Sequence, residues 1–446
     1  MSLKEFTGNK WTKFTFWALL YILWVIWLGN YWWLFGLAVI FDIFITKKVH
    51  WNFWKKRYKE GEKHDAANDW LDAIVFAVIV VTFINIFFFQ AFKIPSSSME
   101  STLYTGDHLF VSKLTYGPRV PQTPLTIPFT HNVIFGKESY STLIQKDYRR
   151  LKGFREVRKG DCVVFGFPHG DTVLRKAPAE DYYTLCRLMG KKQVIENLGP
   201  VIVRPSDKVD HYVKRCVATP GDTLEVREGL VWVNGEQQQV YPGMQLSYKV
   251  VTTGGRINSK VLAKLGLNLD ELWFDANLPG YPAMPLTGKM LEQIRAYGNV
   301  VSVEANIDEY PADYPDSYLT IFPFDPSYRW TRDAFGPLWI PAKGATVELT
   351  AENMPLYERI IGVYENGDPA KALEEGTYTF KQDYYFMMGD NRHNSLDSRY
   401  WGFVPEDHIV GSPSVIWLST VKGKRFPANI RWRRFLKFVS NKQIKR

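Results

Sequence analysis

Cysteine is scarce in this chain of 446 residues, and its three copies, Cys162, Cys186 and Cys216, lie far apart. No CxxC pair and no Cys/His spacing typical of zinc sites is present, which excludes a disulfide framework and a metal scaffold. Cys162 and Cys216 stand in apolar, strand-like runs, which predicts buried free thiols. The sequence shows no metal or nucleotide motif, so we expect no cofactor.

Acidic residues are absent from residues 420–446, which contain ten Lys or Arg. These charges exceed the formal net charge of +9, so the remainder of the chain is close to neutral. This distribution argues against a nucleic-acid-binding protein. Clustered cations with interleaved aromatic rings suit an anionic lipid surface, and a solvated terminus is the alternative. The residues concerned are Arg431, Trp432, Arg433, Arg434, Phe435, Lys437 and Phe438.

Charge is nearly absent from two long runs, residues 14–45 and 73–92. The second run has the length of one membrane-spanning helix. The first is too long for one untilted span and is interrupted by Gly29 and Asn30, so it suits either a hairpin of two short spans or one long, broken helix. We favour the hairpin, because its flanking lysines would then lie on one side of the membrane.

The orientation follows from the loop at residues 46–69, which carries seven Lys or Arg and is therefore predicted to be cytoplasmic. Residues 1–92 are predicted to be a multi-pass anchor in the plasma (inner) membrane, with the chain after Phe92 on the exported, periplasmic side. Bulky residues follow the first apolar core, without the small-x-small pattern of a cleavage site, so we expect the anchor to be retained.

Short apolar runs bounded by glycine, proline, aspartate and asparagine dominate the exported part. They predict a mainly β, antiparallel domain. Residues 178–200 have the apolar spacing of a short helical insertion. Residues 240–375, with their clusters of proline and aromatic residues, are predicted to form a second, inserted β-rich domain. The main β domain would then comprise residues 93–239 and 376–419.

The stretch IPSSSMESTL, residues 94–103, follows the second apolar run. An extended chain, at about 3.5 Å per residue, keeps Ser98 within roughly 20 Å of Phe92. Serines in such a segment usually belong to a flexible loop. A reactive serine needs a base to take its proton, and no histidine of the exported part stands in a recognisable triad context.

A buried lysine can replace histidine as the base, because desolvation lowers its pKa and leaves a neutral amine. Lys214 stands in DHYVKRCVATPGD, an alternating run typical of a half-buried strand, although a solvent-facing edge lysine is the commoner case. Residues 388–405, MGDNRHNSLDSRYWGFVP, form a polar, turn-like segment. Its carboxylates and arginines could lock a neighbouring site through bidentate ion pairs.

Together and in this order, the motifs resemble type I signal peptidases, the membrane-bound Ser/Lys proteases that remove signal peptides from exported preproteins. The similar segments are the two-sided anchor, the S-x-S-M stretch, KGDCVVF at 159–165, YVKRCVATPGD at 212–222 and GDNRHNSLDSR at 389–399. The resemblance implies that Ser98 is the nucleophile and Lys214 the general base. Residues 240–375 and the helical stretch near residue 180 lie outside the motifs.

Further roles come from the same resemblance. It implies an oxyanion hole formed by the Ser96 hydroxyl and the Ser98 amide. In the GDN segment it implies that Ser395 orients the lysine and that Asp397 and Arg399 support the site. It also implies a β-rich cap inserted before the GDN loop and a cleft that accepts Ala-like residues at the first and third positions before the cut. Residues expected to line the cleft are Ile94, Pro95, Met99, Leu103, Tyr212 and Val213.

Preproteins and membrane lipids are the implied partners, and the number of subunits is left open. The chain departs from the family at Ser101, where proline is common, and at His393, where aspartate is common; neither position is catalytic. Two other interpretations stay open. One is a non-enzymatic, membrane-anchored exported assembly or binding factor, in which the serines are a linker. The other is a self-cleaving Ser/Lys protein, which needs a scissile segment in its own chain.

Overall fold

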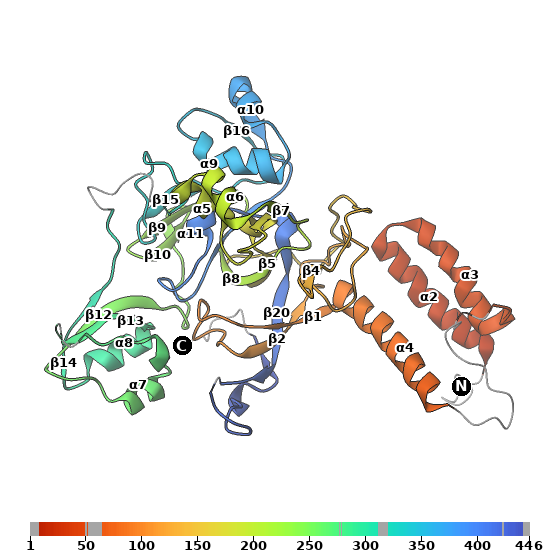
Figure 1. The fold of residues 1–446 in the computed structure, drawn as a ribbon, viewed down its shortest axis with the longest axis horizontal. Helices are drawn as coiled ribbons and strands as arrows, with labels where there is room; N and C mark the ends of the chain where they lie inside the picture. The colour runs from red at the N-terminus through yellow and green to blue at the C-terminus, as the bar shows by residue number, and fades with distance from the viewer. Residues whose placement is uncertain are drawn as a thin grey trace.

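A helical N-terminal part adjoins a larger, mainly β body in the computed structural model of this protein (Figure 1). The chain enters the body through α4 and β1, and the long strand β20 crosses its middle. The residues that the structure describes are 9–49, 51, 65–275, 277, 279–310, 320–421 and 423–439.

The first helix, α2 (Lys10–Leu28), begins at Asn9, whose side chain accepts a hydrogen bond from the Trp11 amide. It ends at Gly29, which adopts the left-handed conformation that closes many helices. The chain then turns back along α2, and the Phe14 and Phe41 rings meet at 5.4 Å. The hairpin predicted for residues 14–45 is therefore present; how often it crosses a membrane stays a prediction. The returning segment consists of η1 (Tyr31–Phe35), α3 (Gly36–Phe41) and η2 (Asp42–Thr46).

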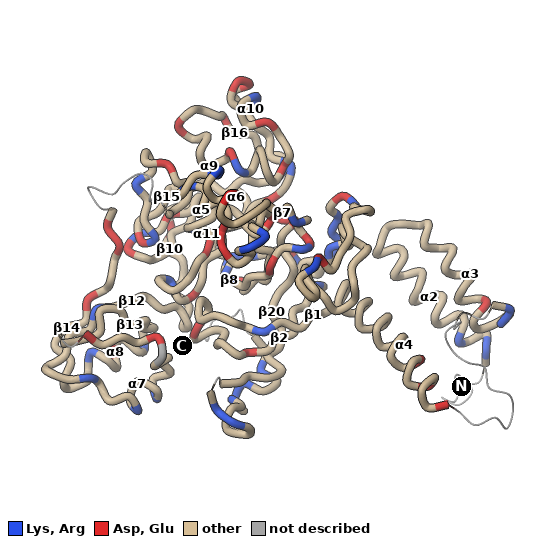
Figure 2. The backbone as a smooth tube through the Cα atoms, viewed as in Figure 1, with Lys and Arg blue, Asp and Glu red and all other residues tan. Residues whose placement is uncertain are grey.

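The second apolar run is divided between two elements. Helix α4 (Ala66–Phe87) starts at the Asp65 cap and ends at Phe87, and strand β1 (Phe89–Lys93) follows. The expectation of one apolar segment to Phe92 is corrected, because composition reports an apolar environment without distinguishing a helix from a strand. Helices α2 and α4 are long and apolar enough to span a membrane, and Figure 2 shows charge only near their ends. Most of the predicted loop 46–69 lies outside the described residues.

The main sheet of the body is antiparallel throughout, which confirms the predicted mainly β, antiparallel fold. It joins strands from both sides of the predicted insertion, and β8 lies between β5 and β18. In order across the sheet the strands are β1, β2 (Asp107–Ser112), β20 (Ile409–Ser419), β5 (Cys162–Gly166), β8 (His211–Ala218), β18 (Tyr384–Met388) and β19 (Val404–Pro405), with β21 (Lys437–Phe438) paired to β20.

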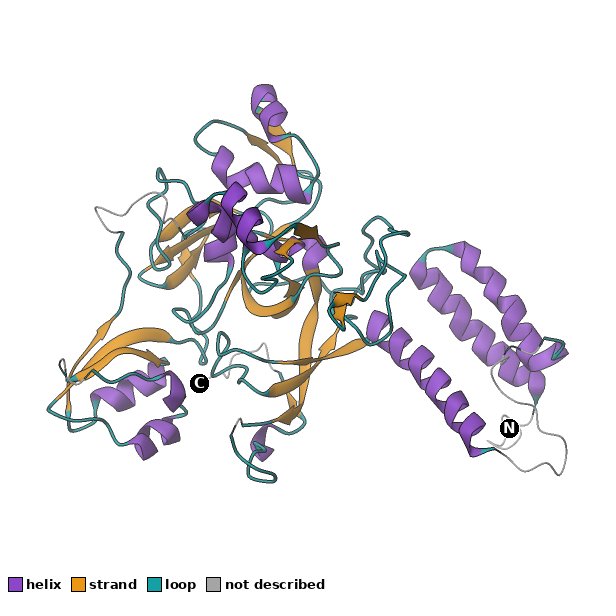
Figure 3. Cartoon of the chain, viewed as in Figure 1, coloured by secondary structure: helices purple, strands orange, loops and turns teal. Residues whose placement is uncertain are grey.

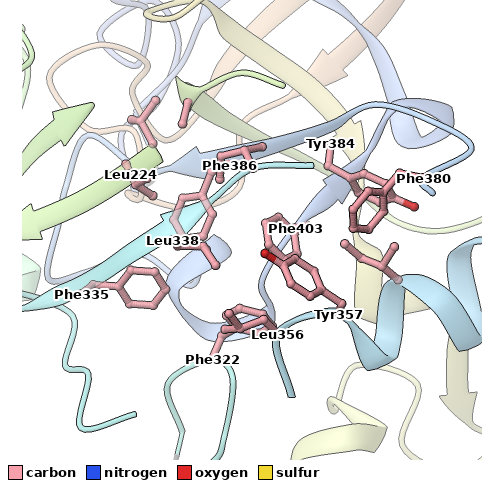
Figure 4. Close-up of a cluster of buried hydrophobic side chains, with 14 of the residues drawn as sticks. Leu224, Phe322, Phe335, Leu338, Leu356, Tyr357, Phe380, Tyr384, Phe386 and Phe403 are labelled. Carbon is pink, nitrogen blue, oxygen red and sulfur yellow. The ribbon is translucent and has the colours of Figure 1, made fainter. Parts of the chain in front are cut away.

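A second sheet brings part of the predicted insertion into the body. Strand β15 (Phe335–Trp339) pairs with β9 (Thr223–Arg227), which precedes the insertion in the chain. Phe335 and Phe380 share an apolar cluster with Leu224 and Phe386 (Figure 4). The remaining elements here are β10 (Leu230–Val233), β11 (Glu236–Gln237), β16 (Thr346–Glu348), α9 (Met354–Arg359), η6 (Ile360–Tyr364), α10 (Pro369–Glu375) and β17 (Thr377–Thr379).

The first part of the insertion is organised differently, as a small α/β lobe (Figure 3). Two helices cover a three-stranded sheet, and residues such as Val250, Met284 and Ile294 form a separate apolar core. The region predicted as one β-rich domain thus contains helices and two unlike parts, and its boundaries stay a prediction. The elements of the lobe are β12 (Leu246–Thr252), α7 (Ser259–Leu265), η4 (Leu269–Glu271), β13 (Gly280–Leu286), α8 (Gly288–Arg295) and β14 (Val300–Ala305).

Two smaller expectations are confirmed. The helical insertion at residues 178–200 is present, and Cys162 and Cys216 are buried and not joined in a disulfide. The other short elements are β3 (Val133–Ile134), β4 (Lys137–Glu138), η3 (Pro168–Asp171), β6 (Thr172–Leu174), α5 (Tyr182–Met189), α6 (Lys191–Leu198), β7 (Val201–Val203), α11 (Ser398–Trp401), η7 (Glu406–His408) and η8 (Trp432–Arg434).

The basic tail returns to the body instead of remaining free. Arg434 is buried, and its guanidinium forms a 2.6 Å ion pair with Asp107. Arg431 donates to the Thr105 carbonyl at 3.0 Å. The sequence left a lipid-facing or a solvated tail open for these two arginines, and a buried carboxylate and a carbonyl engage them instead. Trp432, Phe435 and Phe438 remain exposed.

Candidate active site

A cleft of about 560 Å³ lies where the chain leaves β1 and passes over β8. Ser98 belongs to a turn closed by a hydrogen bond from the Glu100 amide to the Ser97 carbonyl. Lys214 lies on β8, 116 positions along the chain. The Lys214 amine donates to Ser98 Oγ, with 2.5 Å between the two atoms. The structure thus brings together the two side chains that the sequence proposed as reagents.

The lysine lies in surroundings that disfavour its charge. Only 4% of Lys214 is exposed, and no described carboxylate forms an ion pair with its amine. Burial lowers its pKa to about 8, because desolvation outweighs the charge of the nearby Asp397. A substantial fraction of such an amine is neutral in mildly alkaline solution and can accept a proton.

Alternation along β8 explains why the adjacent residues Lys214 and Arg215 have different environments. Successive side chains of a strand point to opposite faces, so Lys214 faces the cleft and Arg215 faces away from it. Arg215 grips Asp390 with two hydrogen bonds of 2.7 and 2.5 Å. Burial alone raises the pKa of Asp390, but the Arg215 charge and hydrogen bonds lower it overall. Arg215 is therefore a paired buried cation beside an unpaired one.

The turn that carries Ser98 is fixed by the GDN segment. The Asn391 amide donates to the Ser98 carbonyl at 3.1 Å, and the Asn391 side chain donates to the Ser97 carbonyl at 3.3 Å. Thr102, just after the turn, donates to Asp390 at 2.5 Å. The Arg215–Asp390 pair therefore connects the strand that carries the lysine to the turn that carries the serine.

A second buried ion pair holds the remainder of the GDN segment. Arg399 donates to Asp397 at 2.9 and 2.8 Å, and both side chains are fully buried. Asp397 also accepts a hydrogen bond from the Gly389 amide at 3.0 Å. A Cβ at position 389 would lie 2.6 Å from the Ser98 carbonyl oxygen, so only glycine fits there.

The other sequence-predicted residues occupy the site in different ways. Ser96 Oγ lies 3.4 Å from Ser98 Oγ. Ser395 lines the cleft, and its buried hydroxyl makes no hydrogen bond to any described residue, so its predicted bond to the lysine is not formed here. Of the expected lining residues, Leu103 instead belongs to the apolar core, because its side chain packs fully buried under the turn. Those that do line the cleft are Ile94, Pro95, Met99, Tyr212 and Val213.

His393 also borders the cleft but is engaged elsewhere. Its Nε2 lies 2.8 Å from Asp333, and its Nδ1 accepts a hydrogen bond from the Ser247 amide at 2.9 Å. The imidazole thus connects the GDN segment to the α/β lobe and to the second sheet. This use of both nitrogens agrees with the expectation that His393 is not catalytic.

Sequence reasoning missed Arg215 and Asn391. A charged residue next to Lys214 in an otherwise apolar strand was an available signal, because a cation on the buried face of a strand needs a carboxylate. The identity of that carboxylate, 175 positions along the chain, could not be read from the strand itself. Within the described residues, no group of three His, Cys, Asp or Glu side chains is arranged to hold a metal ion.

Comparison with known proteins gives a consistent assignment. The family described as "Signal peptidase, peptidase S26" matches residues 67–256 and 348–418. Signal peptidase I of Haemophilus influenzae is 25% identical over 370 residues, covering 83% of this chain and 75% of the relative. Signal peptidase I of Buchnera aphidicola (subsp. Baizongia pistaciae) is 22% identical over 368 residues, or 81% of each chain. Signal peptidase I of Helicobacter pylori (strain 26695) is 23% identical over 359 residues, covering 79% of this chain and 81% of the relative.

A lysine amine hydrogen-bonded to a serine hydroxyl in a cleft is typical of serine hydrolases that use a lysine base. The family match covers more than half of the residues, and the chain belongs to the signal peptidase family, peptidase S26. It is a serine endopeptidase that removes signal peptides from preproteins. Its two long apolar helices are compatible with membrane anchoring. The interpretation as a non-enzymatic exported factor is wrong.

Proposed function

We propose that Ser98 is the nucleophile of this peptidase and Lys214 its general base. The observation that carries the proposal is the 2.5 Å contact between Lys214 Nζ and Ser98 Oγ, two buried side chains that line the cleft. Neutral Lys214 takes the Ser98 proton while Oγ attacks the carbonyl carbon of the scissile bond. The resulting ammonium protonates the leaving amine. Lys214 then activates the water that hydrolyses the acyl-enzyme.

The oxyanion of the tetrahedral intermediate would be held by the Ser98 amide and the Ser96 hydroxyl. Among the described residues, the Ser98 amide has no hydrogen-bond acceptor, so it is available to a substrate oxygen. Ser96 Oγ is close to Ser98 Oγ and exposed to the cleft. Each such donor lowers the activation barrier by about 3 kcal/mol in comparable enzymes.

Ser395 has a different proposed part. Its hydroxyl is buried at the cleft and has no hydrogen-bond partner among the described residues, which is costly unless a substrate or the lysine supplies one. We infer that it meets the Lys214 amine when the ammonium forms, since a hydroxyl oxygen stabilises that charge. Asp397 and Arg399 support the segment without touching the substrate.

The cleft favours small residues before the cut. Ile94, Met99, Tyr212 and Val213 give it apolar walls beside the serine, which suits an extended peptide with Ala-like side chains at the first and third positions. We propose that α4 crosses the membrane and delivers this cleft to its exported face, since only β1 and a short segment separate the helix from Ser98. Exposed Trp432, Phe435 and Phe438 are candidates for contact with lipid.

The test uses the full chain in detergent with a preprotein bearing an Ala-x-Ala site. Ser98→Ala should abolish cleavage, because no other described hydroxyl lies on the Lys214 amine. The matched control is Ser97→Ala, which removes a neighbouring hydroxyl that only accepts a bond from Asn394. Persistent cleavage by a folded Ser98→Ala protein would sink the proposal. A preprotein with bulky residues at both positions tests the specificity and should remain uncut.

A further inference from the structure

A second cavity, of about 500 Å³, lies at the exit of α4, apart from the Ser98–Lys214 contact. Its wall includes Asn85 and Ile86 from the last turns of α4. Opposite them is the segment that follows β2, including Ile127 and Phe129. The amide of Lys113 donates to the Phe88 carbonyl at 2.8 Å, which fixes this lysine directly at the end of the helix.

Three cations line this cavity: Lys113, Arg119 and Lys208. No described carboxylate forms an ion pair or a hydrogen bond with the amine of Lys113 or of Lys208. Burial, together with the charges of Arg119 and Lys208, lowers the pKa of Lys113 to about 7. Burial likewise lowers the pKa of Lys208, which Asp207 only partly offsets.

The one carboxylate in the wall is already occupied. Asp207 accepts hydrogen bonds from the Thr123 hydroxyl at 2.7 Å and from the amides of Gln122 and Thr123. It therefore holds the loop that closes the cavity and has little capacity left for the lysines. Arg119 is anchored by the Asp407 carbonyl, at 2.8 Å. The cavity thus presents an excess of positive charge, and the amines of Lys113 and Lys208 have no hydrogen-bond acceptor among the described residues.

Such a cluster is costly when empty, because sequestered cations without counter-ions lose hydration and repel one another. An anion with several acceptor oxygens removes both costs, and lysine amines are common phosphate ligands. The volume falls within the range of small-molecule sites, so it can hold more than a bare ion.

The surroundings favour one source for the anion. Ile127 and Phe129 are exposed apolar side chains at the cavity, and Ile86 belongs to the apolar surface of α4. A ligand with a charged head and hydrocarbon chains would place its chains along this helix. We propose that the cavity binds the phosphodiester of an anionic phospholipid, with Lys113, Lys208 and Arg119 as its ligands. This inference rests on the membrane crossing proposed for α4 and is independent of the catalytic dyad.

His211 connects the cavity at the end of α4 to the catalytic cleft. It borders both this cavity and the catalytic cleft, three residues before Lys214 on β8. Burial, with the charges of His131 and the three cations, lowers its pKa well below the usual value, so the imidazole is neutral. A bound headgroup would thus lie one side chain from the substrate cleft.

The test measures lipid binding to the full chain in dodecyl maltoside, with phosphatidylglycerol as the probe and native mass spectrometry as the readout. The wild-type protein should retain one phosphatidylglycerol. The double variant Lys113→Met, Lys208→Met should bind it at least about tenfold more weakly, since two charge-assisted contacts are lost. The matched control, Lys137→Met with Lys146→Met, removes two exposed lysines of the same segment and should bind as the wild type does.

Two further arms identify the source of the anion. Inorganic phosphate and phosphatidylcholine, at equal concentration, should bind much more weakly than phosphatidylglycerol; equal binding of either would overturn the lipid assignment. Equal loss in the double variant and the control would overturn the site. The lipid-free double variant should unfold at the same or a higher temperature than the wild type, because it no longer confines unpaired charges. If it does not fold, Lys113→Gln alone supplies the same comparison. Measuring binding on Ser98→Ala protein separates failure here from failure of the dyad.

Discussion

Two regions of this protein each hold a lysine whose pKa is lowered by burial, and they differ in what the amine faces. In the catalytic cleft, Lys214 has a pKa of about 8 and contacts a serine hydroxyl. In the cavity at the end of α4, Lys113 has a pKa of about 7 and faces two other cations. Lys113 has the lower pKa, yet no nucleophilic side chain of the described residues contacts its amine. A lowered pKa therefore reports desolvation, and the neighbouring group decides between proton transfer and anion binding.

Removing the base from the catalytic cleft should have the largest effect. Lys214→Met should reduce the rate of preprotein cleavage by about 10⁴-fold, because the serine loses its proton acceptor. The same variant should unfold at an equal or higher temperature at pH 7, since folding no longer buries an ammonium. Cleavage assays and thermal unfolding in detergent measure both. Lys137→Met, at an exposed position, is the control, and a near-normal rate in Lys214→Met protein would refute a lysine base.

Arg215 differs from both buried lysines because its charge is paired with a carboxylate, that of Asp390. Arg215→Met should lower the free energy of unfolding by about 3–5 kcal/mol, because buried Asp390 loses its counter-ion. The control is Arg227→Met, which breaks the more exposed pair with Glu225 and should cost less than about 1 kcal/mol. Denaturant unfolding gives both values. Equal losses in the two variants would contradict the assignment of Asp390 as a buried, charged anchor.

The pH dependence of the wild-type enzyme distinguishes the two lysines directly. The reactive form of Lys214 is neutral, so the enzyme should be fully active above the pKa of about 8 and should lose activity as pH falls through it. Below that value the rate should fall about tenfold per pH unit. Titration of Lys113 near 7 should leave no separate step. A single step near 6.5 would point to a histidine base instead.

The smallest expected effect concerns Ser101, in the turn that follows Ser98. Ser101 has a φ of 68°, and its buried hydroxyl has no hydrogen-bond partner in the described part of the chain. Ser101→Gly should stabilise the protein by about 1 kcal/mol, because glycine adopts this conformation without strain. Ser101→Ala keeps the strain and should gain less. Ser101→Pro should destabilise it, since the ring fixes φ near −65°. Denaturant unfolding ranks the three variants, and a destabilised glycine variant would contradict this account.

The pairing of Ser98 with Lys214 could be predicted because each residue stands in a short motif that resembles those of type I signal peptidases; local sequence alone favoured a loop serine and a solvent-facing lysine. The mainly β fold was equally accessible, since alternation and turn residues are local signals. The end of α4 at Phe87 was not, because the apolar run continues into β1 and hydrophobicity does not distinguish a membrane helix from a strand.

Long-range pairing explains what the sequence could not supply. β15 pairs with β9 across more than 100 residues, so part of the apparent insertion belongs to the body. The bond between Arg215 and Asp390 and the return of Arg434 to Asp107 depend on the same tertiary arrangement. The cavity at Lys113 had no sequence signal, because a lysine after a strand is an ordinary surface pattern. Periodicity indicates which face a residue occupies and leaves its partner undetermined.

The proposed mechanism requires that the Ser98 oxygen forms the covalent intermediate. The most direct measurement is an acid-quenched reaction with an Ala-x-Ala preprotein, followed by proteolysis and fragmentation mass spectrometry of the peptide spanning residues 94–113. We expect an acyl adduct on Ser98 that is absent from Ser98→Ala protein and from unreacted enzyme. An adduct on Ser96, Ser97 or Ser101 in an active enzyme would contradict it.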